Sequence, residues 1–273
     1  MTSGVIYYNN GQSCAVRLLV SLYSLKQHYS GPVTIISEGK ESDALCSKIA
    51  NAMQVDLKQA SFDTDGPKNH PFLAKTKINQ AAPYDYNVFL DADTLVIGKI
   101  DELFNSAPFT ITRMAEWSTN GPKISRRIKN WGSICPDLIE PALAYGKAIN
   151  TGIFAFRADA SIFNEWYGLT LKNRDSFIPD EISCQLLLPK HLHNLLDYRF
   201  NYSCKYGSNI EDIRIIHFHG RKHCRPGLPF NADKWVKVYN EVVAQNLADI
   251  KSWTPAGDRM LRKYLETQTC TTR

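Results

Sequence analysis

The sequence lacks several features that mark particular classes of protein. It has no apolar stretch near the roughly 20 residues that a membrane-spanning helix needs, and residues 1–5 carry no charged segment leading into an apolar run. Its seven cysteines are an odd number at irregular spacing with no C-x-x-C pair, which argues against a disulfide framework. No internal repeat or low-complexity segment is visible. We therefore expect a cytoplasmic protein without a transmembrane segment.

Composition and charge are those of an ordinary globular protein. Apolar residues make up 44% of the 273 residues and charged residues 22%, so disordered, coiled-coil and collagen-like classes are disfavoured. The net charge of +5 is small and does not require a nucleic-acid partner. Basic residues are dense only in 123–129. Such a cluster is either a solvated face or a rim that attracts an anionic, phosphate-bearing substrate.

Short β-rich segments alternate with helical apolar patterns along the first third of the chain. Strands are expected at 5–8, 33–36 and 87–90, and helices at 15–28, 44–53 and 72–82. The strand at 87–90 is too apolar to be solvated on either face. This alternation predicts an α/β fold with a mixed, mainly parallel, Rossmann-like sheet flanked by helices.

The pattern weakens after residue 93 and then returns. Residues 113–147 show weak periodicity and read as a long irregular segment, which is often functional. Further on, strands are expected at 152–156 and 213–218, and helices at 162–171, 180–188 and 235–243. No linker is evident, so we expect one domain spanning 1–273, with a helical C-terminal extension from about residue 230.

Two aspartates follow the buried strand at 87–90. In an extended segment Asp91 and Asp93 would point the same way, which places two carboxylates close together. A divalent cation such as Mn²⁺ or Mg²⁺ makes such a pair tolerable and leaves coordination positions for substrate phosphates. An isolated D-x-D is more often a cap or turn. Its place at the carboxyl end of a strand, where α/β sheets bind ligands, favours the metal interpretation.

The segment 88–104, which contains this D-x-D, resembles the family 8 glycosyltransferases, which include glycogenin-like and galactosyltransferase-like enzymes. Four further segments resemble landmarks of that family in the same order: residues 24–28, Asn150-Thr151-Gly152, Asp180-Glu181 and His217-Phe218-x-Gly220. The resemblance covers about residues 4–226. It implies a GT-A fold, a nucleotide-sugar donor that is often UDP-linked, manganese, and transfer of a hexose to a glycan, protein or small acceptor with retention of configuration.

The resemblance also implies roles for individual residues. Asp91, Asp93 and His217 would be the metal ligands, and an imidazole is an acceptable manganese ligand beside carboxylates. Lys75 would lie near the donor phosphates and sugar, where a cation stabilises a leaving diphosphate. Asn150 would lie near the transferred sugar.

Asp180 corresponds to the family's carboxylate that contacts the sugar, as a nucleophile or as a stabiliser of positive charge. Because it follows Pro179 at the start of a helix, it could instead be a helix cap. The next residue, Glu181, replaces a frequent glutamine.

Donor contacts are also expected from Tyr8 and Asn9 at the end of the first strand, since aromatic faces suit nucleobases. Ala92, Gly220 and Lys222 complete the expected donor-binding set. The family's lysine usually falls six residues after the histidine, where this chain has His223. The family's base-contacting tyrosine falls at Cys14, and no self-glucosylated tyrosine is recognisable.

Three other functions compete with this one. A zinc site could draw on His217, His219, His223, Cys224 and Cys204, although the spacing is not that of a standard finger. A sugar nucleotidyltransferase would carry a Gly-rich loop with Arg and Lys after the first strand, and residues 9–12 lack one. A module that binds a nucleotide sugar or glycan without catalysis would have no reason to keep Asp91, Asp93, Asp180 and His217 together.

Overall fold

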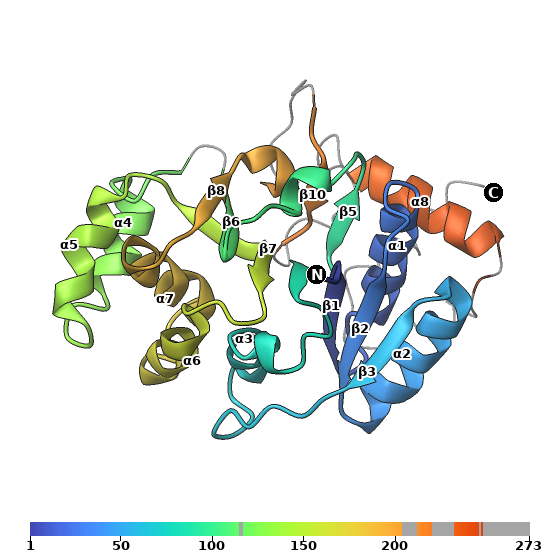
Figure 1. The fold of residues 1–273 in the computed structure, drawn as a ribbon, viewed down its shortest axis with the longest axis horizontal. Helices are drawn as coiled ribbons and strands as arrows, with labels where there is room; N and C mark the ends of the chain where they lie inside the picture. The colour runs from blue at the N-terminus through green and yellow to red at the C-terminus, as the bar shows by residue number, and fades with distance from the viewer. Residues whose placement is uncertain (115–116, 204–211, 220–231, 246, 248–273) are drawn as a thin grey trace, which may run out of the picture. The chain divides into compact units, whose positions relative to one another are not determined.

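A computed structural model of the chain describes residues 1–114, 117–203, 212–219, 232–245 and 247 (Figure 1). The chain divides into two compact units. Unit 1 comprises Met1–Gly4, Ser61–Phe89 and Asp101–Asn201. Unit 2 comprises Val5–Ala60, Leu90–Ile100 and the described residues from Tyr202 onward.

The strands form two sheets. The larger has the order β3-β2-β1-β4-β7-β6-β8 and the smaller the order β5-β10-β9. The seven strands of the larger sheet are β1 (Ser3–Asn10), β2 (Val33–Glu38), β3 (Asp56–Gln59), β4 (Tyr86–Leu90), β6 (Phe109–Arg113), β7 (Ile149–Arg157) and β8 (Asn194–Leu196). Strand pairs β1–β2, β2–β3 and β6–β8 are parallel, whereas β6–β7 is antiparallel. The expected mixed α/β sheet is confirmed.

Helices flank the strands along the chain. They are α1 (Ala15–Lys26), α2 (Lys40–Met53), α3 (His70–Lys75), α4 (Pro122–Lys129), α5 (Pro136–Ala144), α6 (Phe163–Lys172), α7 (Pro179–Leu187) and α8 (Ala232–Ala244). Short 3-10 turns occur at η1 (Ile78–Gln80), η2 (Asp101–Leu103), η3 (Leu188–Lys190) and η4 (Tyr198–Phe200). None of the helices in the described part of the chain is long and apolar enough to cross a bilayer.

Helix α1 is the central helix of unit 2. It contacts β5 (Thr94–Val96), α2 and α8, and from Ala15 to Leu25 only Arg17 is partly exposed. A helix covered on nearly all sides is mostly apolar, and the two serines that α1 buries, Ser21 and Ser24, both make hydrogen bonds. In Figure 1 α1 and α2 lie beside the blue strands of the same unit.

Aromatic side chains fill the core of unit 1. Phe89 on β4 stacks on Phe154 of β7 with ring centroids 4.7 Å apart. Trp166 of α6 meets Phe154 and Phe109 edge-on, at 5.5 and 6.1 Å. Such pairs add about 0.5–1.5 kcal/mol each beyond the burial of their area. They hold β4, β6, β7 and α6 together.

Two sequence-based expectations were wrong. The helix expected at 72–82 ends at Lys75, and the Thr76 hydroxyl donates to the carbonyl of Leu73 at 2.7 Å, a local bond that competes with helix continuation. The segment 113–147, expected to be irregular, contains α4 and α5. Both helices begin with proline, and α5 also holds Pro141 in its interior, which conceals the helical pattern.

Candidate active site

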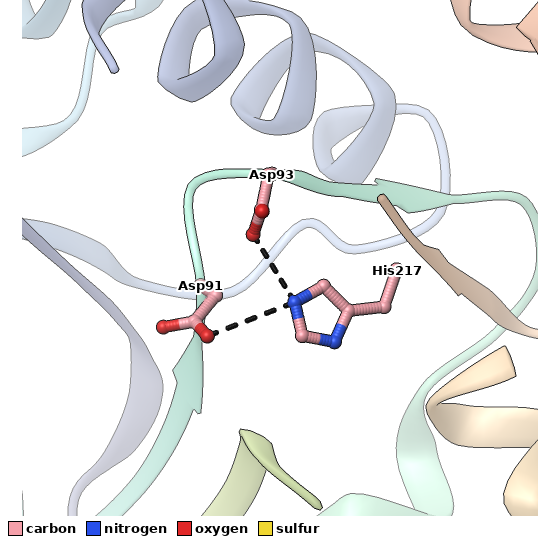
Figure 2. Close-up of side chains that lie close together, drawn as sticks. All are labelled: Asp91, Asp93 and His217. Carbon is pink, nitrogen blue, oxygen red and sulfur yellow. Dashed lines mark hydrogen bonds and ion pairs between the residues drawn. The ribbon is translucent and has the colours of Figure 1, made fainter. Parts of the chain in front are cut away.

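The Asp91-Ala92-Asp93 segment is a turn between two strands. Strand β4 ends at Leu90 and β5 begins at Thr94, so the two aspartates are not in the extended segment that the sequence suggested. The turn nevertheless brings both carboxylates to one place (Figure 2). Their side chains are 25% and 22% exposed, so they remain open to a ligand.

Strand pairing in the smaller sheet brings His217 close to the two aspartates. Strand β10 (Ile215–His217) runs antiparallel to β5, with His217 opposite Thr94. The Phe218 amide donates to the carbonyl of Asp93 at 2.8 Å and extends this pairing into the turn. His217 Nε2 thereby lies 3.1 Å from Asp93 Oδ1 and 3.7 Å from Asp91 Oδ2 (Figure 2).

A series of buried, hydrogen-bonded hydroxyl groups ends on a backbone carbonyl of the turn. The Thr94 hydroxyl donates to the carbonyl of Asp91 at 2.9 Å, and it lies 2.8 Å from the Ser21 hydroxyl. Ser21 lies in turn 2.9 Å from the phenol of Tyr7. All three side chains are fully buried, and burial raises the pKa of Tyr7, which keeps the phenol protonated as the first donor. The turn is therefore fixed to β1 and α1.

The three side chains fit a divalent cation. One ligand atom from each of Asp91, Asp93 and His217 lies within 4.8 Å of the other two. Two carboxylate oxygens and one imidazole nitrogen suit manganese, and three protein ligands leave positions for substrate oxygens. Arg17 of α1 adds a positive charge, with Nη1 3.9 Å from Asp93 Oδ2.

Of the five residues considered for zinc, only His217 and His219 lie among the described residues, with ring centroids 5.0 Å apart. His219 is not part of the cluster, and its Nε2 lies 2.9 Å from the hydroxyl of Ser203 in β9 (Tyr202–Ser203). The other ligands considered for zinc, Cys204, His223 and Cys224, lie outside the described residues.

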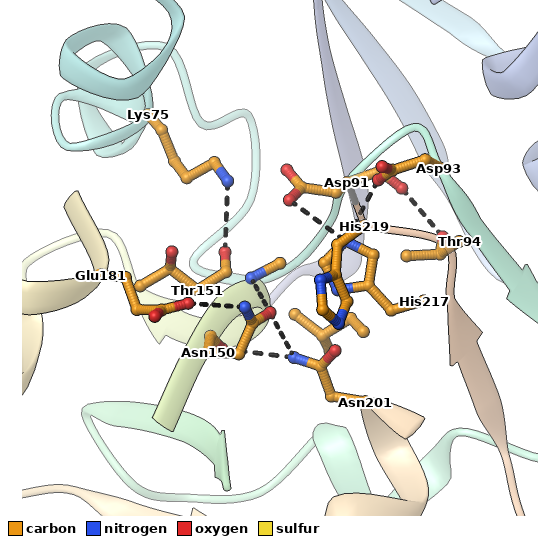
Figure 3. Close-up of polar contacts among 12 residues, drawn as sticks. Lys75, Asp91, Asp93, Thr94, Asn150, Thr151, Glu181, Asn201, His217 and His219 are labelled. Atoms are coloured by element: carbon orange, nitrogen blue, oxygen red, sulfur yellow. Dashed lines mark hydrogen bonds and ion pairs between the residues drawn. The ribbon is translucent and has the colours of Figure 1, made fainter. Parts of the chain in front are cut away.

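A second polar cluster lies in unit 1, at the start of α7. Asp180 is 1% exposed, and its Oδ2 accepts from the Thr151 hydroxyl at 2.7 Å and lies 3.8 Å from Lys75 Nζ. Lys75 Nζ also donates to the carbonyl of Thr151 at 3.4 Å (Figure 3). Asp180 Oδ1 is buried without a hydrogen-bond partner among the described residues. Ile178 occupies the N-cap of α7, so Asp180 is not the cap that the sequence allowed.

Glu181 holds the side chain of Asn150. The Asn150 amide donates from Nδ2 to Glu181 Oε2 at 2.7 Å, and its Oδ1 accepts from Asn201 Nδ2 at 3.0 Å (Figure 3). Burial, and then the negative charge of Asp180, raises the pKa of Glu181 to about 7. The charges of Arg127 and Lys75 and the hydrogen bond from Asn150 lower this pKa by a smaller amount. Hydrogen bonds at both Nδ2 and Oδ1 therefore fix the orientation of the Asn150 side-chain amide.

The other residues expected to contact the donor belong to neither of these two clusters of side chains, or lie outside the described residues. Tyr8 donates to Glu38 Oε2 at 2.5 Å, and Asn9 Nδ2 donates to the Ser42 hydroxyl at 2.8 Å. Ala92 lies in the D-x-D turn with 9% of its surface exposed. Gly220 and Lys222 lie outside the described residues.

Four side chains that contact these clusters were given no role from the sequence. Arg17 and Asn201 belong to no motif, and each acquires its place only through folding. Thr151 lies in the landmark Asn150-Thr151-Gly152, from which only Asn150 was given a role. Arg127 belongs to the basic segment 123–129, whose density in positive charge was the one available signal. Its Nη1 lies 3.8 Å from Glu181 Oε1.

Solved glycosyltransferases share this architecture. The galactosyltransferase LgtC, in a complex with donor and acceptor sugar analogues, matches with a TM-score of 0.63 and 12% identity, over 87% of this chain and 95% of LgtC. The chain has the GT-A fold. The expectation drawn from the sequence is confirmed at the level of the fold.

Two other GT-A structures are larger than this chain. The bifunctional glycosyltransferase WbbM matches with a TM-score of 0.63 and 14% identity, over 96% of this chain and 51% of WbbM. GlyE of Streptococcus pneumoniae TIGR4 matches with a TM-score of 0.61 and 14% identity, over 90% of this chain and 64% of GlyE. The chain thus spans about half of WbbM and under two thirds of GlyE. No family model and no curated protein matches the sequence.

Proposed function

We propose that this protein is a metal-dependent glycosyltransferase that moves a hexose from a UDP-sugar to a glycan, protein or small acceptor with retention of anomeric configuration. The observation that carries the proposal is the convergence of Asp91, Asp93 and His217 after strand β4 of a GT-A fold. The solved structures LgtC, WbbM and GlyE are glycosyltransferases and support the same reaction class.

Asp91, Asp93 and His217 would hold Mn²⁺ or Mg²⁺. When bound, such a cation supplies positive charge that stabilises the diphosphate leaving group of the donor. Neutralising the two carboxylates also offsets the repulsion that they exert on each other and on the phosphates. Arg17, 3.9 Å from Asp93, would add to the positive potential that attracts the donor.

Lys75 and Asp180 would act on the donor sugar and phosphates. Lys75 is a nearly buried cation at 8% exposure, so its charge acts with little screening by water. The unpartnered Asp180 Oδ1 is an acceptor that a sugar hydroxyl would satisfy, which removes the cost of a buried orphan oxygen. Asn150, held by Glu181 and Asn201, would present a fixed amide to the sugar.

In this reaction the bond from the anomeric carbon to the diphosphate oxygen breaks, a bond to an acceptor oxygen forms, and the proton of the acceptor hydroxyl passes to the departing diphosphate. Two routes retain the configuration at that carbon. In one, an Asp180 oxygen bonds to the anomeric carbon before the acceptor replaces it. In the other, the acceptor enters on the face that the diphosphate leaves, and Asp180 stabilises positive charge on the sugar. The retaining outcome rests on the family resemblance, as do the proposed donor contacts of Ala92, Gly220 and Lys222. The proposed contacts of Tyr8 and Asn9 rest on their place at the end of the first strand.

The test is turnover of UDP-sugars with and without Mn²⁺, read as release of UDP from a panel of UDP-hexoses. Activity should require Mn²⁺ and fall at least about 100-fold in Asp93→Ala, because the cation loses a ligand. Asp56→Ala is the matched control, since Asp56 is an exposed aspartate of β3 in the same unit. Circular dichroism would show that both variants keep the fold. Undiminished turnover in Asp93→Ala would sink the proposal.

A further inference from the structure

An exposed aromatic ring lies next to the buried carboxylates of unit 1. Phe177 is 67% exposed, one of three large apolar side chains so exposed in the described part of the chain. The next residue, Ile178, has φ 53° and ψ 65°, a left-handed conformation that is costly for a β-branched side chain. Pro179 follows it and further restricts this backbone. Strain of this kind persists where the surrounding structure enforces it, and here it falls between Phe177 and Asp180.

Arg127 connects this ring to the buried cluster. Its guanidinium carbon lies 4.7 Å from the Phe177 ring centroid and 6.0 Å from that of Trp117. On the other side its Nη1 lies 3.8 Å from Glu181, which holds Asn150. One cation therefore contacts two aromatic faces and the carboxylate that orients a proposed sugar contact.

The charge around these rings is positive. Helix α4 carries four basic residues and no acidic one, and it is anchored by the buried side chains of Ile124 and Ile128. Lys123 Nζ lies 5.1 Å from the Trp117 ring centroid. A basic helix face alone is commonly just solvated. Here the cations lie over aromatic rings, an arrangement that serves ligands with an apolar face and a negative group.

We infer that Trp117, Lys123, Arg127 and Phe177, hereafter the α4 surface, bind an acceptor sugar that carries a carboxylate or phosphate group. The inference rests on the proposed glycosyl transfer and names its acceptor class. The C–H face of the sugar ring packs on Phe177 or Trp117, and the anionic group accepts hydrogen bonds from Arg127 and Lys123. A guanidinium suits this task because it binds carboxylates and phosphates in a bidentate manner.

The test compares acceptors that differ only in charge. The full chain with Mn²⁺ and its active UDP-sugar is offered glucose, glucuronate and glucose 6-phosphate, and then galactose and galacturonate. The kcat/KM for the anionic member of each pair should exceed that of the neutral member by about 2- to 5-fold, the value of one exposed ion pair.

Two variants locate the effect. Phe177→Ala should raise KM for the anionic acceptor about 10-fold, since burying part of a phenylalanine side chain contributes over 1 kcal/mol. Lys123→Gln should reduce the preference for the anionic member about 2- to 5-fold. Neither should change KM for the donor or the acceptor-free hydrolysis of the UDP-sugar. Lys190→Gln, an exposed lysine paired with Glu165, is the matched control and should change nothing.

The outcomes separate the inference from the proposed function. Hydrolysis of the donor together with equal use of neutral and anionic acceptors, or no use of either, would overturn the inference alone. Absence of Mn²⁺-dependent hydrolysis would overturn the proposed function, and the inference with it. Binding to phosphatidylglycerol vesicles that Phe177→Ala abolishes, without any effect on acceptor KM, would reassign the α4 surface to membranes and would also overturn the inference.

Discussion

Replacing Glu181 by glutamine should stabilise the folded protein above neutral pH and leave its stability unchanged in acid. Glu181 is 2% exposed, and burial followed by the charge of Asp180 raises its pKa from 4.5 to about 7. The charged form of this carboxyl is therefore disfavoured in the folded state. Glutamine has nearly the same shape, never becomes charged, and still offers an oxygen to Asn150.

The sign and size follow from proton linkage. Because the folded-state pKa is the higher one, the folded protein binds more protons between pH 4.5 and about 7, and stability falls as pH rises through that window. A difference of about 2.5 pKa units, at roughly 1.4 kcal/mol per unit, amounts to about 3 kcal/mol. Above pH 8 the variant should be more stable than the wild type by up to this amount. This amount already includes the favourable charge of Arg127, which lowers the pKa of Glu181.

The assay is urea denaturation of both proteins at pH 4, 6, 7 and 9. The free energy of unfolding of the wild type should fall relative to that of Glu181→Gln as pH rises, with the two values converging near pH 4. Glu102→Gln provides a control, because Glu102 is exposed. A difference between Glu181→Gln and the wild type that does not vary with pH would refute the assignment of a raised pKa to Glu181.

Two further substitutions probe the supports of the two clusters. Thr94→Val removes the hydroxyl that bonds to the Ser21 hydroxyl and to the Asp91 carbonyl. It should lower the free energy of unfolding by about 1–3 kcal/mol and weaken Mn²⁺ binding about 10-fold. Urea denaturation measures the first effect and Mn²⁺ titration the second. Trp166→Phe should cost about 1–3 kcal/mol in the same denaturation assay, because the buried indole N–H donates to the Asp180 carbonyl at 2.9 Å. No loss of stability in either variant would show that these bonds are not needed.

Local patterns predicted much of the fold. The buried strand β4, helix α1 and the later helices α6 and α7 follow from apolar periodicity and from proline at the helix start. Helix α4 carried a usable signal, since Ile124 and Ile128 are four residues apart and Pro122 begins the helix. Four basic residues in eight obscured it.

The site was predictable only where a motif was local. Asp91 and Asp93 could be read as a pair, but their meeting with His217 depends on β5–β10 pairing across more than 120 residues. The family resemblance, not any periodicity, pointed to His217. Nothing in the sequence indicated that Asn201 would bind Asn150, or that Arg17 would approach Asp93, because both contacts arise from tertiary packing.

The proposed function depends first on whether Asp91, Asp93 and His217 bind Mn²⁺. Electron paramagnetic resonance of free Mn²⁺, recorded during titration with the protein and UDP, measures binding without requiring the acceptor or the donor sugar. We predict one bound Mn²⁺ per chain in the wild type and in Asp56→Ala, and loss of that binding in Asp93→Ala. Equal binding by Asp93→Ala and the wild type, or no binding by the wild type, would contradict it.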